Sequence, residues 1–262
     1  MRRFTILGCG SSGGVPRLGG HWGACDPENP KNRRRRCSLL IEQEGAGGTT
    51  TVLIDTSPDM REQLLDAGVS RLDGVVYTHS HADHVHGLDD LRMIVFNMRA
   101  RLPVYADAAT SADLETRFGY AFHQPHGSPY PPILDLNPLP RDLVIEGPGG
   151  PVDIATFRVS HGSISALGIR SGGIAYLPDV SEIPEESWDA LAGLDTWIVD
   201  ALRLTPHPSH AHLDKTLSWI ERAAPRQAVI TNMHIDLDYA ATDAATPAHV
   251  TPAFDGMVIT CA

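Results

Sequence analysis

The chain has 262 residues, of which 42% are hydrophobic and 20% charged, enough to bury the core of a soluble globular protein. Its formal net charge of −11 excludes a general affinity for the nucleic-acid backbone, because such binding depends on a basic surface that releases counterions. The four cysteines are too few for a disulfide framework, and no run of about 20 apolar residues or secretory leader is found. We therefore expect a cytoplasmic protein with no membrane partner.

The first half of the chain predicts short strands that end in residues able to carry chemistry. The predicted elements are, in order, a strand running into a glycine-rich turn (4–14), the two strands of a hairpin (37–43 and 49–59), a short helix closed by Gly68 (60–68), a strand ending at His79 (73–79), a helix (87–98) and a further strand (102–107).

The second half repeats this alternation after a proline-rich stretch. Residues 123–148 are rich in proline and predict a long irregular loop. The elements predicted after it are strands (152–161, 165–179, 196–203 and 227–234) and one helix (213–223). No linker rich in glycine and serine divides the chain, so we predict a single domain, residues 1–262, that contains two sheets.

Ligand-type side chains gather in the stretch HSHADH, directly after a buried-type strand. The cluster contains His79, His81, Asp83 and His84. Imidazole and carboxylate groups suit Zn, Mn or Fe better than calcium. Structural zinc sites favour thiolates, so a set of histidines and aspartates without cysteine indicates a catalytic metal site that is open to water.

These motifs and their order resemble those of a known superfamily. THSHADH resembles the HxHxDH signature of the metallo-β-lactamase superfamily, and SHG with His161, YLPD with Asp179 and TNMH with His234 follow in the expected order. The resemblance covers nearly the whole chain and implies an α/β fold, the four-layer αββα metallo-β-lactamase sandwich. GSSGGVP, HPSH and FDGM are further similar to the phosphoribosyl 1,2-cyclic phosphate phosphodiesterase group of that superfamily.

The resemblance implies a dinuclear site for two divalent transition-metal ions, Zn or Mn, with Fe also suited to the ligands. It assigns His79, His81 and His161 to one metal. It assigns Asp83, His84 and His234 to the other, with Asp179 as the bridge and Asp83 counted as catalytic too. A hydroxide shared by the ions would be the nucleophile. Asp55 stands where the family places a carboxylate that orients a ligand histidine; the alternative is a cap on the turn before Pro58.

The same resemblance assigns a general acid. His210, in PHPSHAHLD, matches the family histidine that protonates the departing alkoxide, and His212 is the competing candidate. His207 is expected at the surface.

Two departures from the family pattern concern metal ligands. Gly20, Trp22 and Ile235 stand where the family places ligands of a structural zinc, so we expect no structural zinc; an improvised site from His21, Cys25 and Cys37 is the alternative. An ungapped match also puts Asn232 where the late histidine is expected, with His234 two residues further on. The late ligand is therefore either His234 or Asn232.

The favoured function is a phosphodiesterase acting on a phosphoribosyl cyclic phosphate or a 2′,3′-cyclic nucleotide. The alternatives are a thioester or lactone hydrolase on the same fold and a non-catalytic nucleotide-binding relative. The expected partner is a small phosphate-containing substrate or nucleotide and no nucleic-acid polymer, and a homodimer is compatible with the sequence. The run of arginines from Arg33 to Arg36 predicts a solvated basic face, or else a phosphate contact.

Overall fold

The computed structural model describes residues 1–261, which divide into two compact units. The first unit contains Met1–Leu7, Ser38–Asp153 and the residues from Val258 onward. The second unit contains Gly8–Cys37 and Ile154–Met257. Each unit is therefore assembled from segments that lie far apart in the sequence. The expectation of one domain over residues 1–262 stays a prediction.

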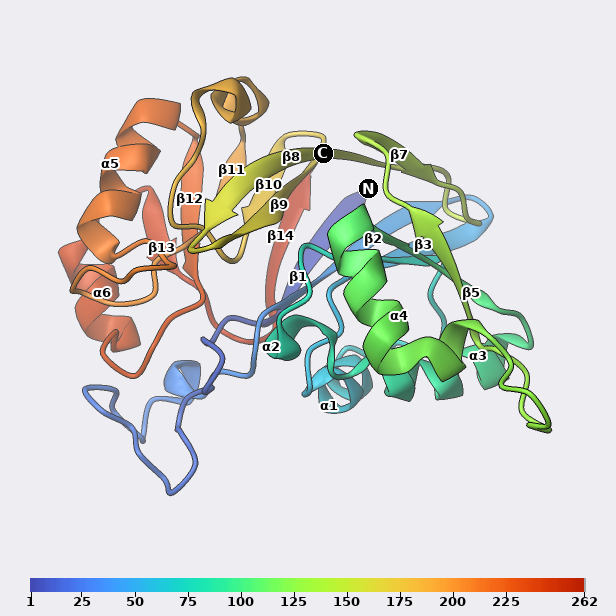
Figure 1. Ribbon diagram of the computed structural model, residues 1–262. Helices are drawn as coiled ribbons and strands as arrows, with labels where there is room; N and C mark the ends of the chain where they lie inside the picture. Colours follow the sequence, from blue (N-terminus) through green and yellow to red (C-terminus); the bar gives the residue numbers. More distant parts are fainter. Residues whose placement is uncertain (262) are drawn as a thin grey trace. The chain divides into compact units, whose positions relative to one another are not determined.

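A mixed sheet of seven strands organises the first unit (Figure 1). In spatial order its strands are β14 (Met257–Cys261), β1 (Arg2–Gly8), β2 (Ser38–Gly45), β3 (Gly48–Ile54), β4 (Gly74–Val76), β5 (Leu102–Ala106) and β6 (Leu134–Pro138). Strands β2 and β3 form an antiparallel hairpin, whereas β3 to β6 run parallel. Because the carboxyl ends of parallel strands meet at one sheet edge, the residues that follow β3 and β4 are brought together there.

Helices of the first unit bury one apolar face each. They are α1 (Met60–Asp66), α2 (Ala82–Val85), α3 (Leu91–Met98) and α4 (Ala108–Phe122). Helix α3 buries Leu91, Ile94 and Val95, which share one face at helical spacing. Helix α4 begins after Asp107, whose carboxylate accepts the Thr110 N–H, and it packs on β5 and β6. No helix in residues 1–261 is long and apolar enough to cross a bilayer.

The second sheet also has seven strands (Figure 1). In spatial order they are β13 (Val250–Pro252), β12 (Gln227–Thr231), β11 (Thr196–Asp200), β10 (Ile174–Leu177), β9 (Ile164–Ser171), β8 (Val152–His161) and β7 (Asp142–Ile145). Strands β10 to β13 run parallel, and β8, β9 and β10 are antiparallel neighbours. Helices α5 (Leu213–Ala223) and α6 (Tyr239–Ala245) accompany β12 and β13 (Figure 1).

Most of the predicted elements are confirmed, and α5 has the predicted bounds. The irregular loop predicted over residues 123–148 is wrong in part, because this stretch contains β6 and β7. Both strands stand last in their sheets, where proline is tolerated, and β7 buries every second residue as a strand with one solvated face does. Helix α4 was not predicted, and residues 87–98 form a 3₁₀ turn (Leu88–Asp90) followed by α3.

The close packing at Gly87 generates a prediction. A Cβ at this position would lie 2.1 Å from the Ser57 carbonyl oxygen, and the Gly87 N–H donates to Thr56. We expect Gly87→Ala to lower the free energy of unfolding by about 1 to 3 kcal/mol, measured by urea denaturation. Gly119→Ala is the matched control, because a Cβ there meets no atom within 4 Å. Equal stability of Gly87→Ala and wild type would contradict this packing.

Candidate metal centre and acid–base pair

The predicted HxHxDH cluster of the first unit lies just beyond the carboxyl end of β4. His79 follows that strand, and α2 begins directly after His81 and carries Asp83 and His84. The His79 ring centroid lies 4.7 Å from that of His81 and 4.2 Å from that of His84. The Asp83 Oδ2 lies 3.7 Å from the His84 Nε2. The structure therefore brings all four predicted ligands of this unit together.

Asp55 orients two of these histidines. It follows β3 and is fully buried, with its Oδ2 2.7 Å from the His84 Nδ1. The same carboxylate accepts the Thr78 N–H at 2.8 Å and the Thr78 hydroxyl at 2.7 Å, and that hydroxyl lies 3.0 Å from the His79 Nδ1. Each Nδ1 therefore carries the proton, and each Nε2 presents its lone pair. The predicted contact of Asp55 with a histidine of the cluster, His84, is confirmed.

In the second unit, three parallel strands end in a cluster of polar side chains. Strand β10 leads to Asp179, β11 ends at Asp200, and β12 leads to Asn232. The Asn232 Nδ2 lies 3.3 Å from an oxygen of Asp179 and 3.3 Å from one of Asp200. All three side chains are buried. Because the three strands run parallel, their carboxyl ends place these side chains together at one edge of the sheet.

His161 joins this cluster from the antiparallel side of the same sheet. It ends β8, and its Nδ1–H donates to the Ser209 carbonyl at 2.6 Å. Its Nε2 therefore faces Asp179, at 3.3 Å from Oδ2. Gly162 continues the chain at φ 60°, and a Cβ there would lie 2.8 Å from Ser209. The glycine is required for the approach that orients the imidazole.

His210 and Asp200 form a hydrogen-bonded pair. The His210 Nδ1 lies 2.9 Å from the Asp200 Oδ2, while the side chain remains 15% exposed. Burial raises the pKa of Asp200 to about 7, and the hydrogen bond and charge of His210 oppose that rise. The carboxylate fixes the Nδ1–H tautomer, so Nε2 is the nitrogen that can exchange a proton with a ligand.

Asp200 was not predicted as a functional residue. Its signal in the sequence is the stretch TWIVD, an apolar strand that ends in aspartate, as YLPD does at Asp179. His212, the competing candidate for the general acid, directly precedes α5. Within the described residues, its side chain forms no hydrogen bond or ion pair. The His207 ring lies 5.2 Å from that of His210. The contacts thus single out His210 as the histidine with an orienting carboxylate.

His234 lies in a different setting from Asn232. Its Nε2 contacts the Arg17 guanidinium, and its Nδ1 lies 3.1 Å from Asp236. Burial lowers the pKa of His234, and the Arg17 charge adds to that effect although Asp236 opposes it. Asn232, by contrast, lies 3.1 Å from the His210 Nδ1 and beside Asp179. The atom of Asn232 that faces these groups is the amide nitrogen, which cannot ligate a metal, so the choice between Asn232 and His234 as the late ligand stays a prediction.

The solvated face predicted for the arginine run is wrong in part, because Arg33 is exposed whereas Arg34 is buried. Arg34 is 1% exposed and donates to the Leu237 carbonyl at 2.7 Å and to Asn32 at 3.1 Å. Its Nη1 also lies 3.9 Å from the Cys25 Sγ, which faces the carbonyl of Leu237 as well. The buried Arg34 guanidinium therefore connects the segment that contains Cys25 and Asn32 with the segment that contains Leu237.

Both donor sets fit divalent transition-metal ions. Imidazoles held with Nδ1–H turned to a protein acceptor offer Nε2 as a ligand, and the nearby carboxylates supply negative charge. His79 and His81 place ligand atoms within 4.8 Å of each other in the first unit, and His161 and Asp179 do so in the second. The donors are imidazole and carboxylate, which suit Zn, Mn or Fe.

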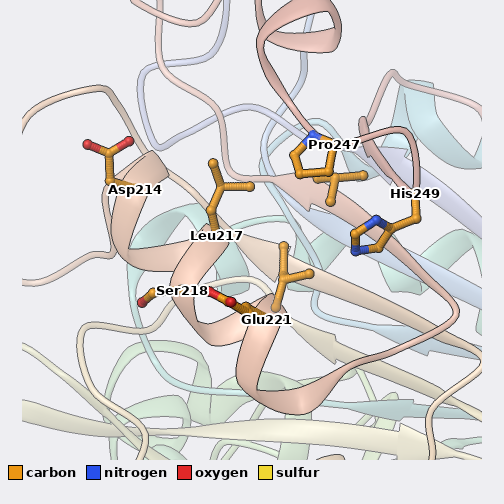
Figure 2. Close-up of a pocket in the computed structure, with 8 residues that line it drawn as sticks. Asp214, Leu217, Ser218, Glu221, Pro247 and His249 are labelled. Atoms are coloured by element: carbon orange, nitrogen blue, oxygen red, sulfur yellow. The ribbon is translucent and has the colours of Figure 1, made fainter.

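A pocket elsewhere in the second unit contains none of the predicted site residues. It has a volume of roughly 430 Å³ and lies between α5 and residues 247–250 (Figure 2). Figure 2 shows Leu217, Pro247 and His249 around it, with the carboxylates of Asp214 and Glu221 on the helix. The chemistry of the candidate site therefore does not depend on this pocket.

Comparison with known proteins identifies the family. Residues 50–235 match the family model of the beta-lactamase superfamily domain. The fold is similar to the crystal structure of a diphosphatase from the PhnP family, with a TM-score of 0.88 and 35% identity over 100% of this chain and 98% of that one. The chain thus belongs to the metallo-β-lactamase superfamily, and the predicted fold class is confirmed. The full-length match places it, more narrowly, in the PhnP family.

Two curated relatives are larger than this chain. One, an octanoyltransferase of Porphyromonas gingivalis, is 33% identical over 260 residues, which cover 97% of this chain and 51% of that protein. The other, a ribonuclease Z of a Bradyrhizobium species, is 30% identical over 145 residues, which cover 54% of this chain and 45% of that protein. The chain spans about half the length of the curated relatives it matches.

The hydrogen bonds of Asp55 generate a prediction on metal affinity. Asp55 has φ 62°, a conformation that asparagine also tolerates, so Asp55→Asn removes the charge with little backbone strain. We expect metal affinity to fall about 10- to 100-fold, measured by competition with a chromogenic chelator. Asp135→Asn, an exposed ion-pair partner of Arg101, is the control. Unchanged affinity in Asp55→Asn would show that the carboxylate orients no ligand.

The late ligand can be decided by metal content. We expect His234→Gln to retain the wild-type number of ions after reconstitution, because its ring nitrogens face Arg17 and Asp236. Asn232→Ala should lose metal affinity, because it removes the amide beside Asp179. Inductively coupled plasma mass spectrometry on dialysed protein measures both. Loss of an ion from His234→Gln together with a fully loaded Asn232→Ala would reverse the assignment.

Proposed function

We propose that this protein is a metal-dependent phosphodiesterase that hydrolyses small phosphodiesters, with a phosphoribosyl cyclic phosphate or a 2′,3′-cyclic nucleotide as the substrate class. The donor sets of both units serve to bind the divalent ions. Membership of the PhnP family supports this proposal, and so does the similarity to a diphosphatase, an enzyme that also cleaves bonds to phosphorus.

The proposed ligands are those of the family pattern. They are His79, His81, Asp83, His84, His161 and Asp179, with Asn232 or His234 as the late ligand. The chemistry that divalent ions supply when bound is Lewis acidity toward water and phosphoryl oxygens. Asp55 and the Ser209 carbonyl hold the imidazoles in the tautomer that such binding requires.

The pairing of His210 with Asp200 is the observation that carries the proposal. Opening a cyclic phosphodiester expels a sugar alkoxide, which is a poor leaving group unless it is protonated. A histidine held by a buried carboxylate, with its side chain partly exposed, is suited to deliver that proton. Asp200 then stabilises the positive imidazole before transfer, and its raised pKa is consistent with a pair that holds one proton near neutral pH.

Size and charge support a small substrate. The net charge of −11 disfavours a polyanion such as tRNA, since binding many phosphates requires many cationic contacts. A single phosphate group needs only a local positive field. The proposed partner is therefore a small phosphate ester and not a nucleic-acid polymer.

An acyl hydrolase is the second candidate, because one relative is named an octanoyltransferase. A thioester releases a thiolate, which departs without a general acid. The His210–Asp200 pair would then have no function in the expulsion step. The phosphodiesterase is favoured for this reason, and a thioester belongs in the same assay.

Leaving-group dependence tests the proposal. His210→Ala should lower kcat for a 2′,3′-cyclic nucleotide by about 10²- to 10⁴-fold, while p-nitrophenolate departs readily from bis-p-nitrophenyl phosphate and shows a much smaller loss. Asp200→Asn should show the same dependence on the leaving group with a smaller loss of kcat, because His210 remains but is no longer oriented by a carboxylate. Steady-state kinetics on the metal-analysed protein gives both values.

His212→Ala is the matched control and should behave as wild type on both substrates. Equal losses of His210→Ala on both substrates with loss of metal would make His210 a ligand instead of the acid. Hydrolysis of a thioester but of neither phosphodiester by the wild type would reject the proposed function.

A further inference from the structure

Helix α4 of the first unit packs along the segment that carries the HxHxDH cluster. The Phe118 ring lies edge-on to the His86 ring, with 5.9 Å between the ring centroids, and the Tyr120 hydroxyl donates to Asp89. His86 is the residue at which α2 ends, and Asp89 lies in the 3₁₀ turn that follows. These contacts tie α4 to the part of the segment that leads away from His84.

Helix α4 is itself anchored to the first sheet. Its first turn is capped by Asp107, which accepts the Thr110 N–H at 2.9 Å, and the Ser111 hydroxyl donates to the carbonyl of Ala106 at the end of β5. Farther along, the helix buries Leu114 completely and packs on β5 and β6. A loop that is bonded to α4 is therefore held in place relative to the sheet.

Two side chains of α4 hold Ser80, the residue between His79 and His81. The Ser80 hydroxyl donates to the Asp113 Oδ2 at 2.5 Å, and the Arg117 Nη1 donates to the Ser80 carbonyl at 2.5 Å. The Arg117 Nη2 lies 3.5 Å from the same carboxylate oxygen, because the two residues are one helical turn apart. Ser80 is thus held through its side chain and its backbone at the same time.

The strength of these contacts lies in the bonds to Ser80. An exposed ion pair contributes little to stability, and the side chains of Asp113 and Arg117 are 50% and 38% exposed. A hydroxyl that donates to a carboxylate, by contrast, makes a short charge-assisted hydrogen bond, which is stronger than a neutral one. The pair is therefore better suited to fixing a loop than to stabilising the fold.

His81 is the histidine of the cluster that burial restrains least. His79 and His84 are each 1% exposed, and the hydrogen bonds that begin at Asp55 orient their rings. His81 is exposed to solvent. Its neighbour Ser80, held by α4, is the nearest point at which the fold fixes the chain before this ligand.

We propose that Asp113 and Arg117 are positioning residues of the metal centre, which act through Ser80 to hold the His81 imidazole where it can bind an ion. The peptide bond between Ser80 and His81 is planar, so a bond to the Ser80 carbonyl fixes the plane from which His81 extends. Groups that orient a ligand without touching the metal change its affinity for the protein. This inference rests on the metal-binding role proposed for His81 and does not depend on the substrate.

Metal affinity tests the inference without catalysis. Ser80→Ala and Asp113→Asn should each lower the affinity for Co²⁺ about tenfold, measured by competition with a chromogenic chelator. Glu115→Gln is the matched control and should bind as wild type, because it removes an exposed carboxylate of the same helix that faces His123 instead of the loop. Urea denaturation of metal-free Asp113→Asn should give the wild-type midpoint, since the lost ion pair is exposed. Wild-type affinity in Asp113→Asn, or an equal loss in Glu115→Gln, overturns the inference.

A double variant tests whether the two residues act through one hydrogen bond. Ser80→Ala combined with Asp113→Asn should lose no more Co²⁺ affinity than the weaker-binding single variant, because either change alone removes the bond. Ser80→Ala combined with Glu115→Gln should bind as Ser80→Ala does. Losses that multiply in the first pair would show that Ser80 and Asp113 act independently, which contradicts the proposed role.

The visible spectrum of bound Co²⁺ separates this inference from the proposed metal centre. The spectrum reports the arrangement of ligands around the ion, so it should change in Asp113→Asn and in Arg117→Gln and stay as in the wild type in Glu115→Gln. The inference requires this change together with the loss of affinity. A wild type that binds Co²⁺ and an Asp113→Asn variant with the same spectrum overturn only the inference. A wild type that binds no Co²⁺ overturns the metal centre, and with it the proposed function and the inference.

Discussion

A carboxylate removed from water must have its charge compensated by hydrogen bonds, and this constraint shapes both units of the protein. Asp55 and Asp200 are each fully buried. Asp55 is compensated by Thr78 and His84, and Asp200 by the Val180 N–H and His210. In each case one of the donors is an imidazole, so the bonds that make burial tolerable also select the tautomer. Stability and chemistry therefore depend on the same contacts.

The backbone at the strand ends is strained where it serves this arrangement. Asp55 and Asn232 adopt φ of 62° and 59°, a region that costs most side chains about 1 to 2 kcal/mol. Asparagine and aspartate tolerate it best. In both residues this conformation follows directly after a buried strand. Such strain persists only where surrounding contacts determine it, as the hydrogen bonds of both residues do here.

The sequence predicted the ligand cluster well because its members are close together in the chain. The stretch from His79 to His84 carries its own spacing, and the superfamily order supplied the rest. Asp200 escaped prediction because its partner, His210, lies ten residues away across a loop, and no local pattern links a strand-end aspartate to a distant imidazole. The sequence leaves the choice between Asn232 and His234 open, because the two residues are only two positions apart, and their different partners follow from a left-handed turn at Asn232.

Arginine placement shows why net charge is a poor guide to a local field. Arg34, expected on a solvated face, is buried among backbone carbonyls because a planar guanidinium can satisfy several acceptors at once. That burial helps to fix the loop carrying Arg17 beside the segment that carries His234. The net charge therefore describes the chain as a whole, whereas the position of each guanidinium group depends on the acceptors that surround it.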